Sequence, residues 1–183
     1  QNLQADVSEM ERMVEGYLAF MRGQDSEEVV DTNIRNLINR VAIDAGRKGV
    51  NVSIAAEVVS SVDETNAKGN DVTVPLRPNA IRRCMTNLVD NAARHGEHVE
   101  ISVGWVKDQL EISVDDNGPG IPEAQREEVF RPFHRLDASR NAETGGVGLG
   151  LAIARDVAHN HGGEILLSDS PLGGLRASLR LPL

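Results

Sequence analysis

The chain is constrained most by one short stretch, residues 114–122, which reads Val-Asp-Asp-Asn-Gly-Pro-Gly-Ile-Pro. It follows apolar residues that alternate with polar ones, at Leu110, Ile112 and Val114, and this alternation predicts a half-buried strand. Proline fixes its own φ angle, and glycine allows backbone angles and close approaches that other residues resist. The strand must therefore end in a loop whose bare backbone a ligand can touch.

Asp116 stands just before this loop, so its carboxylate can reach into the same site. A carboxylate only accepts hydrogen bonds, which suits a ligand edge that donates them, such as the exocyclic amine of adenine. A plain turn is the alternative interpretation, because an Asn-Gly pair such as Asn117-Gly118 is also common in hairpins.

The composition is typical of a soluble globular protein. The 183 residues, 40% hydrophobic and 26% charged, suffice for one core and an appendage. A net charge of -9 argues against a nucleic-acid partner, whose binding surface would usually be basic. The single cysteine, Cys84, excludes an intramolecular disulfide and a cysteine metal cluster. No apolar run reaches the roughly 20 residues that span a bilayer. Because the chain starts at Gln1 in a helical pattern, we interpret it as a fragment of a longer protein.

Residues 1–23 are predicted to form a helix. Its apolar residues are spaced alternately four and three apart, as in a heptad seam: Leu3, Val7, Met10, Val14, Tyr17 and Met21. This spacing favours a short coiled coil or one helix of a helical hairpin over a helix packed on its own domain. The polar residues 24–30 are predicted to be a hinge, and residues 31–183 the main domain.

The main domain alternates helical and strand patterns. Helices are predicted after a cap at Asp31-Thr32, from Pro78-Asn79 and from about Gly150, and strands at 51–55, 72–76, 99–106, 109–114, 164–168 and 175–181. Mixed elements with several adjacent hairpin-like strands predict a two-layer α/β sandwich, with one mixed sheet and helices on one face. Residues 118–146 have little periodicity, which is typical of a lid or binding loop.

Two asparagines, Asn87 and Asn91, lie four residues apart on the predicted third helix and therefore share a face. Arg94 and His95 follow at the end of the helix. A carboxamide oxygen can bind a hard cation such as Mg²⁺, which takes its other ligands from water and substrate phosphates. The alternative is a pair of buried asparagines whose side chains bond to the backbone.

A glycine run, Gly146-Val147-Gly148-Leu149-Gly150, opens the last predicted helix. Small residues there let phosphates approach backbone N–H groups at the positive end of a helix. Tight packing of helix on sheet is the alternative. The run matches neither the Walker-A loop nor the dinucleotide-binding glycine pattern.

The predicted lid carries two of the five aromatic residues in the chain, Phe130 and Phe133, three positions apart. They could hold the lid on the body of the domain. Arg135 and Arg140 could pair with phosphate oxygens, although each alone could equally be a solvated surface charge.

Four segments, 87–95, 116–120, 130–133 and 146–150, resemble in order and spacing the N, G1, F and G2 boxes of sensor histidine kinases. These enzymes share a superfamily with gyrase, Hsp90-type chaperones and mismatch-repair ATPases. The chain looks like the osmosensing, porin-regulating type, and the resemblance implies the Bergerat-type ATP-binding fold. The leading helix resembles the second helix of the dimerisation and phosphoacceptor hairpin.

The resemblance implies an ATP and Mg²⁺ site. Its residues would be Asn87, Asn91, Arg94, His95, Asp116, Gly118, Gly120, Ile121, Phe133, Arg135, Arg140, Gly146, Val147, Gly148, Leu149 and Gly150. Asn91 would hold the metal, with Asn87 supporting it and the phosphates. Asp116 would accept from the adenine amine, and Arg135 would approach the γ-phosphate. Arg94 and His95 would contact the nucleotide near its phosphates.

The same resemblance implies a reaction and its partners. ATP would phosphorylate a histidine on the acceptor helix of a homodimer, and the phosphoryl group would pass to a response regulator. The domain would lie in the cytoplasm, attached to an inner-membrane bacterial sensor. The position of Asn87 is a glutamate base in the water-using ATPases, and asparagine cannot take a proton at neutral pH, which disfavours hydrolysis. The acceptor-histidine motif is missing, so the chain should bind ATP without phosphorylating itself.

Two rival functions remain open from the sequence. One is a hydrolytic ATPase of the same fold. The other is a catalytically silent module that binds nucleotide or another protein.

Overall fold

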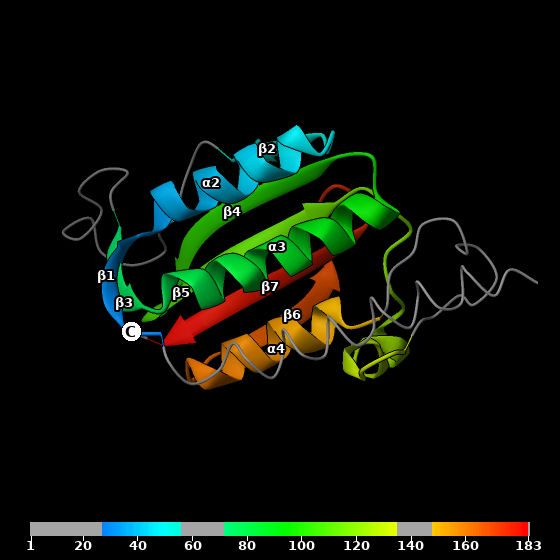
Figure 1. The fold of residues 1–183 in the computed structure, drawn as a ribbon. Helices are drawn as coiled ribbons and strands as arrows, with labels where there is room; N and C mark the ends of the chain where they lie inside the picture. Colours follow the sequence, from blue (N-terminus) through cyan, green and yellow to red (C-terminus); the bar gives the residue numbers. More distant parts are fainter. Residues whose placement is uncertain (1–26, 56–71, 135–147, 183) are drawn as a thin grey trace, which may run out of the picture.

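A computed structural model gives the structure of the chain and describes residues 27–55, 72–134 and 148–182. In these ranges, helices α2, α3 and α4 lie over one face of a sheet (Figure 1). The elements are β1 (Val30–Asn33), α2 (Ile34–Arg47), β2 (Val52–Ile54), β3 (Thr73–Leu76), α3 (Pro78–His95), β4 (Val99–Val106), β5 (Gln109–Asp116), the 3-10 turns η1 (Glu123–Gln125) and η2 (Glu128–Phe130), α4 (Gly150–Asn160), β6 (Glu164–Asp169) and β7 (Leu175–Pro182).

The main sheet is mixed, as predicted, with the strand order β2-β4-β5-β7-β6. Strands β2 and β4 are parallel, and the other neighbours are antiparallel. The expectation of a single sheet was wrong for β3. This strand pairs with β1 in a separate two-stranded sheet, with Val30 opposite Leu76.

The predicted cap at Asp31-Thr32 was also wrong, because these residues belong to strand β1. Asn33 caps α2 instead, and its side chain accepts a hydrogen bond of 2.8 Å from the backbone N–H of Asn36. The chain just before β1 is bound to the start of α3. The Glu27 carboxylate accepts from the N–H groups of Asn79 and Ala80 at 2.7 and 2.9 Å, at the start of α3.

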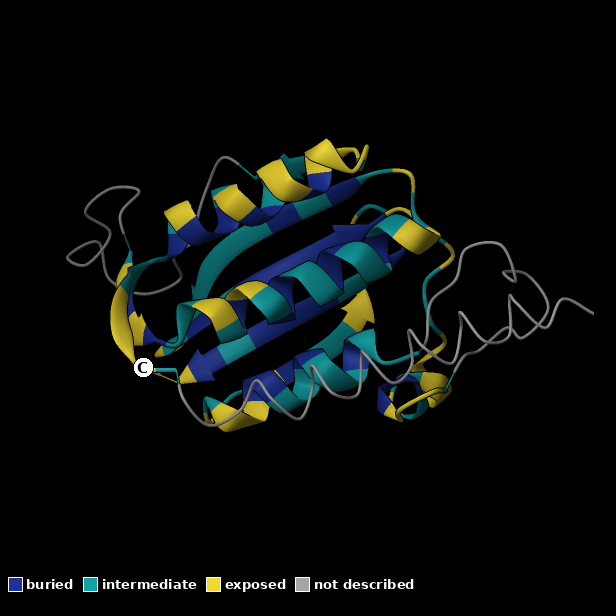
Figure 2. Ribbon diagram, viewed as in Figure 1, coloured by how far each residue is buried: buried dark blue, intermediate teal, exposed yellow. Residues whose placement is uncertain are grey.

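The core lies between the helices and the sheet, where Figure 2 shows the buried residues in dark blue. Alternate residues of β5 (Leu110, Ile112 and Val114) point into it and are at most 1% exposed. The apolar stripe of α3, which includes Ile81 and Met85, covers them. The alternation along the strand and the helical spacing therefore meet as the sequence predicts.

Strand β5 continues two residues further than predicted, to Asp116. Strand pairing therefore holds Asp115 and Asp116, and Asp116 lies opposite Val99 of β4. The predicted helix at 1–23, hinge residues 24–26 and the second part of the predicted lid, at 135–146, lie outside the described residues. None of the described helices is long and apolar enough to span a membrane.

Candidate nucleotide site

Asp116 is the centre of the candidate site, and only 2% of its surface is exposed. Its Oδ1 atom accepts hydrogen bonds from the backbone N–H groups of Gly118, at 2.8 Å, and Leu175, at 3.1 Å. Its backbone carbonyl accepts from the N–H of Gly174 at 3.1 Å. Within the described ranges Oδ2 forms no hydrogen bond. The site therefore holds a buried carboxylate that keeps one acceptor for a ligand.

Two glycines fit closely around this carboxylate. A Cβ atom at Gly118 would lie 2.5 Å from the carbonyl oxygen of His95, and one at Gly174 would lie 2.2 Å from Asp116 Oδ1. Any side chain at either position would force backbone or carboxylate to move. The prediction for Gly118 thus has a steric reason, whereas sequence reasoning missed Gly174 and Leu175. The only signal was the Gly-Gly turn before an alternating strand, and nothing local linked it to Asp116.

The end of α3 is tied to the same loop through Asn117. Its Oδ1 atom accepts from the backbone N–H groups of Glu97 and His98, at 2.9 and 3.0 Å. The backbone of His95 consequently lies against Gly118, while the side chains of Arg94 and His95 are exposed. The structure thus brings the last turn of α3 to the loop, as the sequence predicts.

The two asparagines of α3 differ in how far their side chains are satisfied. The Asn87 amide nitrogen donates to the carbonyl of Arg83 at 2.9 Å. One of its two polar atoms is therefore bonded to the backbone, as the alternative interpretation expects. Its Oδ1 atom faces Gly150, where a Cβ atom would lie 3.5 Å away. The half-buried Asn91 side chain forms no hydrogen bond with any described residue. The Asn87 oxygen is therefore available beside the start of α4.

The start of α4 carries the described part of the glycine run. Gly148 has a φ of +73°, and its carbonyl accepts from the N–H of Phe133 at 2.9 Å. Leu149 precedes the helix and supplies no side-chain cap, so no side chain competes for the first N–H groups of α4. The structure thus brings four of the predicted nucleotide-binding residues together: Phe133, Gly148, Leu149 and Gly150. Four other predicted residues lie outside the described ranges: Arg135, Arg140, Gly146 and Val147.

The far side of the loop opens into a pocket of about 340 Å³. Gly120 and Ile121 line it, together with Arg126, Asp169 and Gly174 and four further residues. Asp116 does not line this pocket. Sequence reasoning named Gly120 and Ile121 but missed Arg126 and Asp169. Figure 1 shows the end of α3, the end of β5 and the start of α4 at this same end of the sheet.

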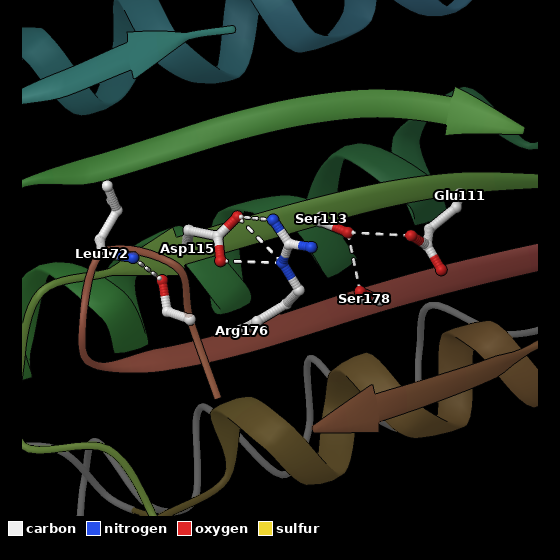
Figure 3. Close-up of polar contacts among 7 residues, drawn as sticks. Glu111, Ser113, Asp115, Leu172, Arg176 and Ser178 are labelled. Carbon is white, nitrogen blue, oxygen red and sulfur yellow. Dashed lines mark hydrogen bonds and ion pairs between the residues drawn. The ribbon is translucent and has the colours of Figure 1, made fainter. Parts of the chain in front are cut away.

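Arg176 and Cys84 are unavailable to a ligand, because the first is paired and the second is buried. On the opposite face of β5, Arg176 donates three hydrogen bonds to Asp115, at 2.8, 2.9 and 3.2 Å (Figure 3). The hydrogen bond to Asp115 raises the pKa of Arg176 above its usual value. Burial raises the pKa of the Cys84 thiol to about 12, so this thiol is not a nucleophile. No group of three or more His, Cys, Asp or Glu side chains that could hold a metal occurs among the described residues.

Comparisons with known proteins agree with this geometry. Residues 76–183 match the family described as "Histidine kinase-, DNA gyrase B-, and HSP90-like ATPase". Over 186 residues the chain is 34% identical to the sensor histidine kinase CpxA of Escherichia coli strain K12, covering the whole of this chain and 39% of CpxA. It is 37% identical over 178 residues to the sensor histidine kinase GtrS of Pseudomonas aeruginosa, covering 97% of this chain and 34% of GtrS. The chain thus spans less than half the length of these relatives.

A solved structure has the same fold. The ATP-binding domain of PrrB from Mycobacterium tuberculosis matches with a TM-score of 0.65 and 32% sequence identity, over 85% of this chain and 98% of that one. The family match covers more than half of this chain, and it includes α3, the loop after β5 and the start of α4. The chain therefore belongs to the histidine kinase-, DNA gyrase B- and HSP90-like ATPases, among the ATP-binding domains of sensor histidine kinases.

Proposed function

We propose that this chain is the catalytic domain of a two-component sensor kinase that transfers the γ-phosphoryl group of ATP to a histidine. The observation that carries the proposal is the buried Asp116 carboxylate, which keeps Oδ2 for a ligand at the end of the sheet where α3 and α4 meet. Oδ2 accepts no hydrogen bond from the described residues, so a donor on a bound base could bind to it.

The same carboxylate supports selectivity for adenine. Adenine presents an exocyclic amine, whereas guanine presents an oxygen acceptor at the corresponding position. A carboxylate facing that oxygen would leave two acceptors buried against each other, at a cost of about 1–3 kcal/mol. Gly118 and Gly120 would leave room for the base, and Ile121 would contribute an apolar wall.

The residues present fit a magnesium ion that is held together with the phosphates. Asn91 offers a side-chain oxygen without a hydrogen bond to any described residue, and the Asn87 oxygen faces the start of α4. Mg²⁺ accepts few protein ligands when phosphates supply the rest, so the lack of a carboxylate cluster in the described ranges fits this mode of binding. When bound, the ion would neutralise charge on the phosphates.

Asn87 also favours transfer over hydrolysis. An amide cannot remove a proton from water at neutral pH, whereas an imidazole needs no base to attack as a nucleophile. The work of this chain would then be to position ATP. Arg135 would approach the γ-phosphate and Arg140 would assist, while Arg94 and His95 would contact the nucleotide near its phosphates. The backbone from Gly146 to Gly150 would line those phosphates.

The partners of the whole protein follow from the same proposal. Residues 1–23 would be the second helix of a dimerisation hairpin, joined by a short hinge to the domain, to which Glu27 and strand β1 from Val30 already belong. The acceptor histidine would lie on the other helix of the hairpin, in a homodimeric sensor of the bacterial inner membrane with this domain in the cytoplasm. A response-regulator aspartate would receive the phosphoryl group.

The first test is titration calorimetry of the chain with ATP and GTP, each with and without Mg²⁺. We expect ATP-selective binding that weakens when Mg²⁺ is removed, whereas no binding of either nucleotide would overturn the proposal. The acceptor hairpin of the same sensor is then added with ATP labelled at the γ-phosphate. Label on histidine, lost in acid and kept in alkali, is the expected result. Steady phosphate release without the hairpin would instead support a hydrolytic ATPase, and binding without any transfer would support a silent module.

A further inference from the structure

The loop that follows Asp116 is fastened from behind by Arg126. The Nε–H of Arg126 donates to the carbonyl oxygen of Ile121 at 3.0 Å. The same guanidinium forms an ion pair with Asp169, the last residue of β6. Only 19% of the Arg126 side chain is exposed, against 87% for Asp169. One half-enclosed side chain therefore holds both the candidate base loop and the end of a neighbouring strand.

The turn that begins after Asp169 leads back to the centre of the site. The N–H of Ser170 donates to the carbonyl of Gly174 at 2.9 Å, which closes the turn between β6 and β7. Gly174 in turn donates to the carbonyl of Asp116. Gly120 of the loop packs on the same residue, since a Cβ atom at Gly120 would lie 3.3 Å from the Gly174 oxygen. The contacts thus form a closed ring from Asp116 through the loop, Arg126, Asp169 and the turn back to Asp116.

We propose that Arg126 is a positioning residue for recognition of the adenine base. Arg126 joins Ile121 to the end of β6 and so fixes the loop relative to Gly174. In that position of the loop, the amine of the base would meet Asp116 Oδ2. This inference rests on the proposed function, because it assigns a role within the same nucleotide site. Arg126 contacts the loop and the strand, and it need not touch the nucleotide.

Arginine suits this role because its planar guanidinium carries several donors in a fixed arrangement. One donor satisfies a backbone carbonyl while another pairs with a carboxylate, so the angle between the two partners is fixed. Lysine is a single point charge and would hold Asp169 or Ile121 but not both in that geometry. Because Asp169 is exposed, its ion pair alone contributes little, and the bond to Ile121 carries most of the effect.

The test compares two nucleotides that differ only in the group that Asp116 would recognise. ATP and purine riboside triphosphate, which lacks the exocyclic amine, are titrated into the whole chain by calorimetry. We expect the wild type to prefer ATP by about 10- to 100-fold, the value of a satisfied buried acceptor. Arg126→Ala should reduce this preference to a few-fold, and Arg126→Lys should give an intermediate value. A general loss of stability would weaken the binding of both nucleotides equally and leave the ratio of their affinities unchanged.

Arg180→Ala is the matched control. Arg180 forms an ion pair of 2.6 Å with Glu111 and is 30% exposed, but it lies towards the other end of β7. Its loss should leave the preference for ATP as it is in the wild type. If Arg126→Ala does not fold, Arg126→Lys decides, since lysine keeps the charge but loses the two contacts in their fixed geometry and should still lower the preference.

The outcomes separate the two proposals. A wild-type chain that binds neither nucleotide contradicts the proposed function and the role of Arg126 with it. A wild type that prefers ATP, with a folded Arg126→Ala variant that keeps the full preference, overturns the positioning role alone. An equal loss of preference in Arg180→Ala overturns it as well, because the effect would then not be specific to the loop.

Discussion

Two adjacent aspartates at the end of β5 face opposite sides of the sheet and have different partners. Asp115 is fully buried on the face without helices, where Arg176 donates to both of its oxygens (Figure 3). Asp116 is almost as buried on the helical face, yet only backbone N–H groups donate to it, and only to one oxygen. Burial alone therefore does not distinguish the carboxylate that we propose binds the base. The partners distinguish it, since Asp115 is satisfied by the fold and Asp116 only in part.

The surroundings of the two carboxylates follow the same division. Asp115 lies in a row of polar contacts that β5 and β7 complete between themselves, with Ser113 and Ser178 at 2.7 Å. Around Asp116 the chain places glycines instead, at positions where a Cβ atom would collide with it or with the nearby backbone. Side chains thus surround Asp115, whereas close-packed backbone surrounds Asp116. The predictions below test this contrast.

The largest effect is expected for Asp116→Asn. The asparagine oxygen can still accept from Gly118 and Leu175, but its amide would point a donor at the adenine amine. Affinity for ATP should fall about 100-fold, because two buried donors would face each other, while the unfolding midpoint should change little. Calorimetry and thermal unfolding measure the two quantities. Unchanged ATP affinity would remove Asp116 from base recognition.

Gly174→Ala should disturb both the fold and the site. The new Cβ atom would lie 2.2 Å from Asp116 Oδ1 and 2.5 Å from its carbonyl oxygen, so the start of β7 must shift. We expect a loss of about 2 kcal/mol in the free energy of unfolding, the usual scale of a buried steric clash, together with weaker ATP binding. Gly46→Ala is the control, since a Cβ atom there meets nothing within 4 Å. Equal stabilities for the two variants would show that the close fit at Gly174 is unimportant.

Asp115→Asn should act on stability alone. It removes the charge that faces Arg176, whose side chain is 33% exposed and can turn towards water. The free energy of unfolding should fall by about 1–2 kcal/mol, with ATP affinity as in the wild type. A fall in affinity as large as that of Asp116→Asn would erase the distinction between the two carboxylates.

Labelling of Cys84 gives an independent measure of unfolding for these variants. At a pH of about 8.5 an exposed thiol is half ionised and reactive, whereas the folded chain keeps Cys84 protonated because its pKa is about 12. The folded state therefore binds the extra proton, and this contribution to stability is lost as the pH rises from 9 towards 12. Fast alkylation of the native chain at pH 8.5 would contradict this assignment.

The smallest effect is expected for Ser178→Ala. It removes one partner of the 2.7 Å contact with Ser113, whose hydroxyl also donates to Glu111 at 3.5 Å. A net loss of about 0.5–1 kcal/mol in the free energy of unfolding follows for one hydrogen bond, without any change in ATP binding. Urea unfolding monitored by circular dichroism measures it. A larger loss would mean that the polar row acts as a unit rather than as separate pairs.

Features that depend on neighbouring residues could be predicted from the sequence. The alternation at Leu110, Ile112 and Val114 and the turn-forming Asn117-Gly118 each lie within a few residues, so their strand and loop were evident. The boundary at Asp116 was missed because pairing with Val99 of β4 extends the strand into the polar residues.

Features that depend on distant segments could not be predicted in the same way. The pairing of β1 with β3 joins residues whose patterns fit several partners, and the cap at Asn33 was assigned two residues early because Asp31 and Thr32 cap helices equally well. Arg126 and Asp169 are 43 residues apart, and both are of types common on surfaces. Their role is visible only when the sheet places the end of β6 behind the loop.

The hydrogen bond from Leu175 to Asp116 spans 59 residues, and this separation has a consequence for how the protein is made. While the ribosome has delivered the chain only as far as residue 170, Asp116 lacks the backbone donors of Gly174 and Leu175. A nucleotide stabilises only the form to which it binds. If Asp116 binds the base as proposed, ATP would stabilise only those molecules in which β7 has already joined the sheet, and it would not assist earlier steps in the folding of the nascent domain.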